Sequence, residues 1–520
     1  MNGLRVLGWI VKADVLERTR RYSFLVTILA TLYLGYLVDN GTIGVHLGRC
    51  RPLPTSAWTG MMMALCTITF VCLVGFYVVG NAVARDRTTG VGQILAATSM
   101  SSRMYVLGKQ LSNFIVLSIV TCILAGGAVL IQVFEGKGLE LRPLLSPFLF
   151  LALPAMFFTG AAAVLFECVW FLRGVFGVIV YFFLFTALVV VPMETGSMAY
   201  DVYGLKLAMD RIQADARRAV PDYDGNFSIG TDAVTYAHMT DMRWEGISWS
   251  AADAGHRALP LLYAVALTLA GGLFFDRFAG SRRERRVAAE SAHAPRRGRR
   301  LATALPHLAG SVLESAAAPW GFTRMLLAEM RLMLRGLPWW WYLVGLGLWI
   351  ASVSLDIRAA RANVLPFLWL LPVLLWSAMG TREDRFRTGG VLFSAPRPLA
   401  RQFTAAWGAG LIAALVAASG LIVRLACSGN GGALLALCAG ALFIPSLAAA
   451  LGVWSGSSRP FEALYVGLWY VGPLHHIGSI DFMGTTDSAV AAGSPAVFAV
   501  AAVALFAAAI AGRRRQIEGM

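Results

Sequence analysis

Long runs of apolar residues, separated by short polar segments, dominate this chain. A helix needs about 20 mostly apolar residues to cross the ~30 Å hydrocarbon core of a bilayer. The run at 463–473 is short unless its helix begins nearer Arg459. The pattern predicts an all-α polytopic membrane protein with about twelve transmembrane helices. The runs cover residues 23–38, 58–82, 111–134, 147–166, 175–191, 258–275, 339–355, 365–379, 403–423, 433–454, 463–473 and 490–511.

Two of the polar, basic segments between these runs resemble each other. The first polar loop, residues 84–109, follows the second run, and the second polar loop, residues 381–402, follows the eighth. A repeated unit is more informative than a single motif, so the similarity predicts two loops with one function. The positions that correspond at one common offset are Arg85 with Arg382, Asp86 with Glu383, Gly92 with Gly389 and Leu95 with Leu392.

Each half of the chain begins with a segment that has the pattern of an amphipathic helix. In the first twenty residues and in residues 322–337, apolar side chains recur at helical spacing and charged ones fall on another face. We expect both helices to lie along the inner membrane surface; the alternative is a solvated helical segment before a span. The charged face of the first includes Asp14, Glu17 and Arg18.

The order of elements that follows is the same in both halves. After the amphipathic helix come a span, an outer loop, a span, the polar loop and four more spans, and Pro154 and Pro445 lie inside the fourth span of each half. Residues 1–280 and 316–520 are therefore expected to form two parallel six-helix repeats. The basic, Gly- and Pro-containing residues 281–315 are expected to form a cytoplasmic linker.

The charge distribution indicates how the chain crosses the membrane. The net charge is +15, and 31 of the 44 Lys and Arg residues fall in segments on the side of the two termini. The positive-inside rule places the termini and both polar loops in the cytoplasm. With this distribution, we interpret the basic excess as topology and contact with anionic lipids, and we do not expect nucleic-acid binding.

One segment on the other side of the membrane has no counterpart in the second half. Residues 194–256 contain ten Asp and Glu against five Lys and Arg. Residues 203–220 favour one helix that ends before Pro221. We interpret the segment as an extracytoplasmic insertion that can contact a partner outside the cell.

Most enzymatic and ion-coupled activities find no support in the sequence. The chain has no phosphate-binding loop, H-E-x-x-H or G-x-S-x-G motif, and its seven cysteines show no CxxC spacing. We therefore expect no catalytic, cofactor-binding or metal-binding residues on this chain. The apolar cores also contain no charged residue, whereas an ion-coupled transporter usually retains one there.

The polar loops are the candidate place where energy enters from outside. A short helix at 90–97, and its counterpart at 388–394, offers a small apolar face formed by Ile94 and Leu95 or by Val391 and Leu392. Such a face suits insertion into a groove on a soluble partner. The alternative is a solvated loop that only reverses the chain.

These loops resemble those of the type-2 (ABC-2) permeases of ATP-binding-cassette transporters. That family has an amphipathic inner-surface helix, six spans per half, and an acidic residue followed by a glycine and a leucine-rich turn between the second and third spans. The first loop departs from the pattern, with Thr98-Ser99 where the second has Ala395-Pro396. The resemblance implies that these loops dock the ATPase, and the candidate docking residues are Arg85, Asp86, Gly92, Ile94, Leu95, Arg382, Glu383, Gly389, Val391, Leu392 and Pro396.

The resemblance implies a permease subunit in the bacterial inner membrane that depends on two copies of a separate soluble ATPase. ATP and Mg²⁺ would bind to that partner and not to this chain. The implied activity is export of a lipid-like, peptide or other amphiphilic substrate. Two alternatives remain: a twelve-span secondary transporter, or a permease-like scaffold that presents its outer insertion to a partner.

Overall fold

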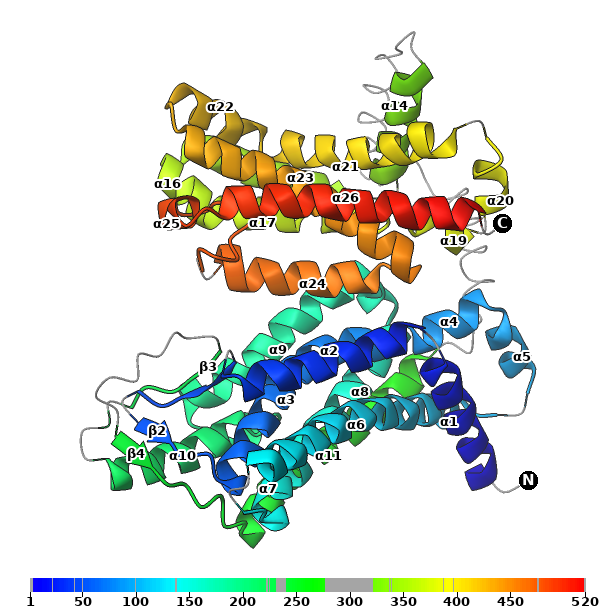
Figure 1. The fold of residues 1–520 in the computed structure, drawn as a ribbon. Helices are drawn as coiled ribbons and strands as arrows, with labels where there is room; N and C mark the ends of the chain where they lie inside the picture. Colours follow the sequence, from blue (N-terminus) through cyan, green and yellow to red (C-terminus); the bar gives the residue numbers. More distant parts are fainter. Residues whose placement is uncertain are drawn as a thin grey trace. The chain divides into compact units, whose positions relative to one another are not determined.

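The computed structural model of the chain describes most of the sequence. The described residues are 3–20, 22–41, 43–48, 50–98, 100–135, 138–220, 223, 225–230, 240–275, 321–335, 337, 339–386, 388–395, 397–474 and 477–518. Linker 281–315 lies outside these residues. The chain divides into two compact units, Met1–Arg286 and Val287–Met520 (Figure 1).

Helices make up most of the described part of the first unit, which also contains four short strands. The helices are α1 (Gly3–Thr19), α2 (Tyr22–Asp39), α3 (Ser56–Val79), α4 (Ala82–Thr88), α5 (Val91–Ala97), α6 (Ser102–Glu135), α7 (Leu141–Pro147), α8 (Leu153–Cys168), α9 (Val175–Thr195), α10 (Leu205–Ala219) and α11 (Ala251–Phe274). The strands are β1 (Gly44–His46), β2 (Cys50–Pro52), β3 (Ser228–Gly230) and β4 (Thr240–Met242).

The described part of the second unit is helical. Its α-helices are α14 (Gly321–Leu334), α15 (Trp339–Ser354), α16 (Ile357–Ala359), α17 (Leu365–Leu370), α18 (Val373–Trp376), α19 (Arg382–Phe386), α20 (Gly389–Leu392), α21 (Thr404–Ala417), α22 (Ser419–Cys427), α23 (Gly431–Ser455), α24 (Arg459–Trp469), α25 (Asp487–Ala491) and α26 (Ser494–Glu518).

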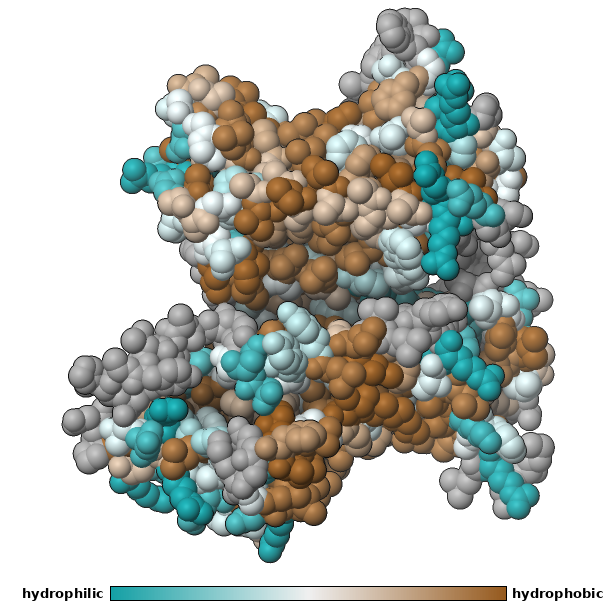
Figure 2. All heavy atoms as spheres, viewed as in Figure 1, coloured by the Kyte–Doolittle hydropathy of each residue, from teal (hydrophilic) through white to brown (hydrophobic). Residues whose placement is uncertain are grey.

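Nine helical stretches in the described residues are long and apolar enough to cross a membrane. Nine of the twelve predicted runs coincide with these stretches, and the runs at 23–38 and 339–355 coincide with the shorter apolar helices Thr27–Asp39 and Trp340–Ser354. The run at 463–473 is covered by α24, which begins at Arg459 and ends at Trp469, and by the π-helical turn Tyr470–Leu474 that follows it. Figure 2 shows apolar side chains over the middle of the helices in each unit and hydrophilic ones near the helix ends. The chain is therefore a helical multi-pass membrane protein.

Different secondary-structure elements lie at the two ends of the first unit. α1, α4 and α5 lie at one end, and the four strands and α10 lie at the other (Figure 1). β1 pairs with β3 in antiparallel orientation, and β2 pairs with β4 in parallel orientation. The loop between α2 and α3 thus pairs with strands of the insertion 194–256. The helix predicted at 203–220 is present in this insertion as α10.

Pro154 interrupts its helix locally, and a buried arginine compensates for the interruption. Proline has no N–H, so the carbonyl of Phe150, four residues earlier, lacks its helical partner. A π-helical turn, Phe148–Ala152, precedes the proline. Arg257 of α11 donates from Nε to the Phe150 carbonyl at 3.0 Å. A neighbouring helix thus satisfies the carbonyl that the proline frees, which is the condition for a proline inside a membrane span.

Candidate functional site: two polar loops with buried charge clusters

The first polar loop folds into two short helices, α4 and α5. The helix predicted at 90–97 is present as α5, which begins at Val91 after Gly90. Gly90 has φ of 80°, a left-handed conformation that glycine adopts without a steric penalty. In the second polar loop α19 and α20 replace them, and α20 is shorter than the helix predicted at 388–394.

Asp86 in α4 is buried and is held by two side chains of α6. Tyr105 of α6 donates its hydroxyl to Asp86 Oδ2 at 2.7 Å, and Lys109 Nζ lies 2.8 Å from the same oxygen. A buried carboxylate needs such partners because removing a charge from water is costly. Asp86 therefore holds α4 against the beginning of α6 and is not free to contact a partner protein.

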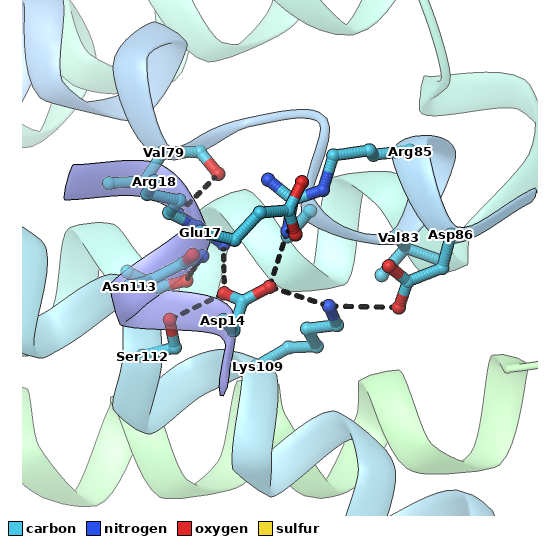
Figure 3. Close-up of polar contacts among 12 residues, drawn as sticks. Asp14, Glu17, Arg18, Val79, Val83, Arg85, Asp86, Lys109, Ser112 and Asn113 are labelled. Atoms are coloured by element: carbon cyan, nitrogen blue, oxygen red, sulfur yellow. Dashed lines mark hydrogen bonds and ion pairs between the residues drawn. The ribbon is translucent and has the colours of Figure 1, made fainter. Parts of the chain in front are cut away.

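Asp14 in α1 is the centre of the cluster to which Asp86 belongs (Figure 3). Its carboxylate pairs with Arg18 at 2.8 Å, with Lys109 at 2.7 Å and with Arg85 of α4. It also accepts a hydrogen bond from Ser112. Lys109 bridges Asp14 and Asp86, so α1, α4 and α6 meet at one buried set of ion pairs.

Two residues of the charged face of α1, Asp14 and Arg18, are buried inside the first unit. Asp14 is 4% exposed, Arg18 is also buried, and Trp9 on another face of the helix is 65% exposed. Arg18 donates to the carbonyl of Val79 at 3.3 Å, at the end of α3. Helical periodicity identified this face, but the face turns inward because the polar loop supplies partners of opposite charge.

The cluster also controls how strongly Asp14 holds its proton. Burial by itself raises the pKa of Asp14, but Arg18 and Lys109 outweigh burial. The pKa of Asp14 therefore lies below its ordinary value of 3.8. α1 thus carries a permanently ionised group at neutral pH.

Glu167 at the end of α8 binds the other end of α4. Its carboxylate accepts hydrogen bonds from the backbone N–H groups of Ala82, Val83 and Ala84, at 2.9, 2.6 and 3.0 Å. These are among the groups that a helix leaves unpaired in its first turn, and Asn81, which precedes the helix, provides no side-chain cap. Glu167 directly follows the predicted run at 147–166, and no local signal in the sequence indicates this capping.

The second polar loop has its own buried cluster around Glu383 in α19. Gln402 donates to Glu383 Oε1 at 2.8 Å, and Arg513 of α26 lies 3.0 Å from Oε2. Gln402 corresponds to Tyr105 at the same offset that relates Glu383 to Asp86. Arg382 pairs with Glu329 of α14 at 3.2 Å, as Arg85 pairs with Asp14 of α1.

The pKa values of the two acidic residues of this cluster, Glu383 and Glu329, are shifted in opposite directions. Burial raises the pKa of Glu383, but Arg513 and the hydrogen bond from Gln402 outweigh burial, so this pKa lies below its ordinary value. Burial also raises the pKa of Glu329, and there Arg382 does not compensate, partly because the charge of Glu383 opposes ionisation. The pKa of Glu329 lies above its ordinary value of 4.5.

The apolar residues predicted for docking are exposed at matching positions. Ile94 is 69% exposed and Val391 is 78% exposed. The residues after them, Leu95 and Leu392, are half-buried. Leu95 packs against a buried cluster that includes Val83 and Tyr105. Each loop therefore presents an apolar side chain outward at the same position, and Val91 in the first loop and Phe386 in the second are exposed as well.

The remaining candidate residues also have the same burial at corresponding positions of the two loops. Gly92 and Gly389 are buried, and Arg85 and Arg382 are half-buried. Pro396 lies outside the described residues. The matching burial supports one interpretation of all of these positions: charged residues fix the loop from within, and Ile94 and Val391 are available for contact.

In the part of the chain that the structure describes, no three His, Cys, Asp or Glu side chains gather as metal ligands would. No protein-family model, curated protein or solved structure matches the chain. Its function has to be inferred from the geometry of the two loops.

Proposed function

We propose that this chain is the membrane subunit of an ATP-driven exporter of the ABC-2 type. In this proposal the chain forms twelve spans as two parallel repeats in the bacterial inner membrane, with both termini and both polar loops in the cytoplasm. Two copies of a separate soluble ATPase bind the loops. ATP hydrolysis on those partners then drives export of a lipid-like, peptide or other amphiphilic substrate.

The observation that carries the proposal is the match between the two loops in burial and in contacts. Asp86 and Glu383 are buried and fixed, whereas Ile94 and Val391, eight residues further along in each loop, are exposed. A loop that only reversed the chain would not need a buried ion cluster to hold its conformation. A rigid loop with an apolar tip suits force transmission from a docked partner.

The buried contacts also provide a route from the loop into the membrane. In the first unit, α4 is tied to α1 through Arg85, to α6 through Asp86 and to α8 through Glu167. A push on α5 would therefore reach three helices through ion pairs and hydrogen bonds that do not stretch easily. This arrangement favours coupled movement of the helices over local bending of the loop.

The charged residues of the candidate spans do not support ion coupling. The buried acidic residues on these helices lie near the helix ends, and each has a partner: Asp86 has Lys109, Glu167 has α4, Asp253 has Arg211 and Ser250, and Glu462 of α24 has Arg459 at 3.9 Å. A secondary transporter needs a carboxylate that can exchange its ion during transport. The export proposal does not need one.

The test is association with the ATPase and ATP-dependent transport. The double variant Ile94→Ala and Val391→Ala removes both exposed tips, so we expect about tenfold weaker association of the ATPase that co-purifies with the wild-type chain. The matched control is Val500→Ala, an equally exposed valine on α26. The control should bind as wild type does. If the double variant bound the ATPase as tightly as the wild type does, the docking proposal would be wrong. Transport without any ATPase would favour the secondary transporter.

A further inference from the structure

Arg513, on the last helix of the second unit, is a contact of the second polar loop that the sequence did not suggest. Its Nη2 lies 3.0 Å from Glu383 Oε2, and both side chains are buried. Its guanidinium also lies over the rings of Phe393 and Phe403, at 5.2 and 5.6 Å from their centroids. A cation enclosed in this way contacts the loop from two directions.

The surroundings of Arg513 distinguish it from a residue that only orients the chain in the membrane. Three consecutive arginines lie in the last two turns of α26, and Arg514 and Arg515 are exposed while Arg513 is 2% exposed. The two exposed arginines suffice for a positive cytoplasmic end. Burial of the third in an ion pair is costly unless its partners are well placed, so its position calls for another explanation.

α26 is tightly joined to α23 beside Arg513. Gln516, which accepts from Arg513 Nη1 at 3.0 Å, donates to the carbonyl of Val453 at 2.8 Å. A Cβ added at Gly512 would lie 2.8 Å from Trp454 Nε1 and 2.9 Å from Val453 Cγ1. The backbone of α26 at Gly512 therefore packs directly against the side chains of Val453 and Trp454 on α23, which leaves little room for the two helices to slide independently.

The beginning of the second polar loop is equally close to α23. A Cβ added at Gly380 would lie 2.9 Å from Val453 N, and one added at Gly452 would overlap the carbonyl oxygen of Met379. Gly380 also has φ of 75°, which a residue with a side chain rarely adopts. The loop, α23 and α26 thus form one close-packed junction, with Arg513 as its charged link.

α26 extends from this junction to the other end of the unit. There Phe498 packs against Phe443 of α23 and Phe482, with ring centroids at 5.0 and 5.9 Å. α25, which ends at Ala491, contacts the beginning of α26. A displacement of the loop that moves Arg513 would therefore be transmitted along one helix to residues 482–492.

We propose that Arg513 is a positioning residue that transmits movement of the second polar loop to α26, and through α26 to the opposite end of the unit. The inference rests on the proposed function, because it assumes that a docked ATPase moves the loop. It adds to that function a route through the last helix, fixed by a single ion pair with Glu383.

The experiment follows the far end of α26 while ATP acts at the loop. A reporter cysteine is introduced as Ala492→Cys, at an exposed position just before α26, and the exposed Cys122 and Cys427 are replaced by serine. The full chain is purified with its co-purifying ATPase in lipid nanodiscs. The rate of reaction with a soluble maleimide is measured without nucleotide and with ATP plus vanadate. We expect ATP plus vanadate to change this rate by about fivefold or more, the lower end of usual coupling between sites.

Four variants identify the link. Arg513→Met should keep the ATPase bound but lose the ATP-dependent change, and Arg513→Lys should restore it because the charge returns. Glu383→Gln removes the charge from the loop side and keeps the hydrogen-bonding shape, so it serves if Arg513→Met does not fold. Arg514→Met, at the exposed neighbour, should behave as wild type does.

The outcomes separate the two proposals. If Arg513→Met and Glu383→Gln both keep the full ATP-dependent change, the inference is wrong and the proposed function stands. If no ATPase accompanies the wild-type chain, the proposed function fails and the inference fails with it. If Arg513→Lys is as defective as Arg513→Met, the role of Arg513 depends on shape and not on charge, which also overturns the link as proposed.

Discussion

The two polar loops share a sequence pattern but obtain their stabilising charges from different parts of their units. Lys109, near the beginning of α6, neutralises Asp86 in the first loop. Arg513, 130 residues away from Glu383 in the sequence, takes that role in the second. The comparison teaches that the pattern specifies a buried acidic residue, whereas the surrounding helices decide which cation pairs with it.

The amphipathic helices show the same contrast. Asp14 of α1 has Arg18, Arg85 and Lys109 as partners, whereas Glu329 of α14 has Arg382 and lies close enough to Glu383 to be opposed by it. In the first cluster, three cations surround the carboxylate of Asp14. In the second, one cation pairs with Glu329 and the negative charge of Glu383 opposes its ionisation. The two halves of the molecule should therefore respond differently to loss of an acid.

The largest expected effect is loss of Asp14. The variant Asp14→Asn leaves Arg18 and Lys109 buried without their main counter-charge, which typically costs about 3–5 kcal/mol. We expect a large fall in the unfolding temperature of the full chain in nanodiscs. Glu17→Gln is the control on the same helix, because Glu17 is half exposed and surface ion pairs contribute about 1 kcal/mol or less. Equal effects of the two variants would contradict the assignment of Asp14 as the centre of the cluster.

An intermediate effect is expected from Glu167. The variant Glu167→Gln removes the charge that accepts three N–H groups of α4, and loss of a helix cap costs about 1–2 kcal/mol. Faster hydrogen exchange should be confined to α4 and the residues beside it. The exposed Glu140→Gln is the control. Unchanged exchange at Ala82, Val83 and Ala84 in the Glu167 variant would show that the cap does not hold the loop.

The smallest effect, and the one with the clearest sign, concerns Glu329. Its raised pKa means that the folded protein favours the protonated form, so this stability is present below the ordinary pKa of 4.5 and is lost as pH rises through the folded pKa. Glu329→Gln, which resembles the protonated form, should be slightly more stable than wild type at neutral pH. The difference should vanish as the pH falls toward 4.5 in thermal unfolding. If Glu329→Gln were less stable than wild type at neutral pH, ionised Glu329 would stabilise the fold, and the raised pKa would be contradicted.

The lowered pKa values of Asp14 and Glu383 make stability depend on pH in the opposite direction. Asp14 and Glu383 contribute stability above their ordinary pKa values, and this contribution is lost only as pH falls through their lower folded values. The first cluster should therefore show no loss of stability over the range in which Glu329 titrates. Only strongly acid conditions should weaken it.

Features with a local cause could be predicted from the sequence. The apolar runs predicted the helices, because burial in a bilayer requires a fixed length of apolar residues. The helices at 90–97 and 203–220, the second ending before Pro221, were predicted and are present as α5 and α10. The correspondence of Ile94 with Val391 was also visible, because it depends only on alignment of two segments.

Features that depend on contacts between distant residues could not be predicted. The pairing of β1 with β3 joins residues near 45 and 229. The donation from Arg257 to Phe150 and the capping by Glu167 likewise connect separate helices. Helical periodicity placed Asp14 and Arg18 on one face, but it could not tell that this face would meet Lys109 and turn inward.

The sequence by itself determined that this chain is a helical membrane protein with two similar polar loops, because hydrophobic length and spacing are local properties. Only the tertiary structure decided what the charged residues do. Asp86 and Glu383 are internal anchors because Lys109 and Arg513 are brought beside them, and a charge can remain buried only where the fold supplies its partner.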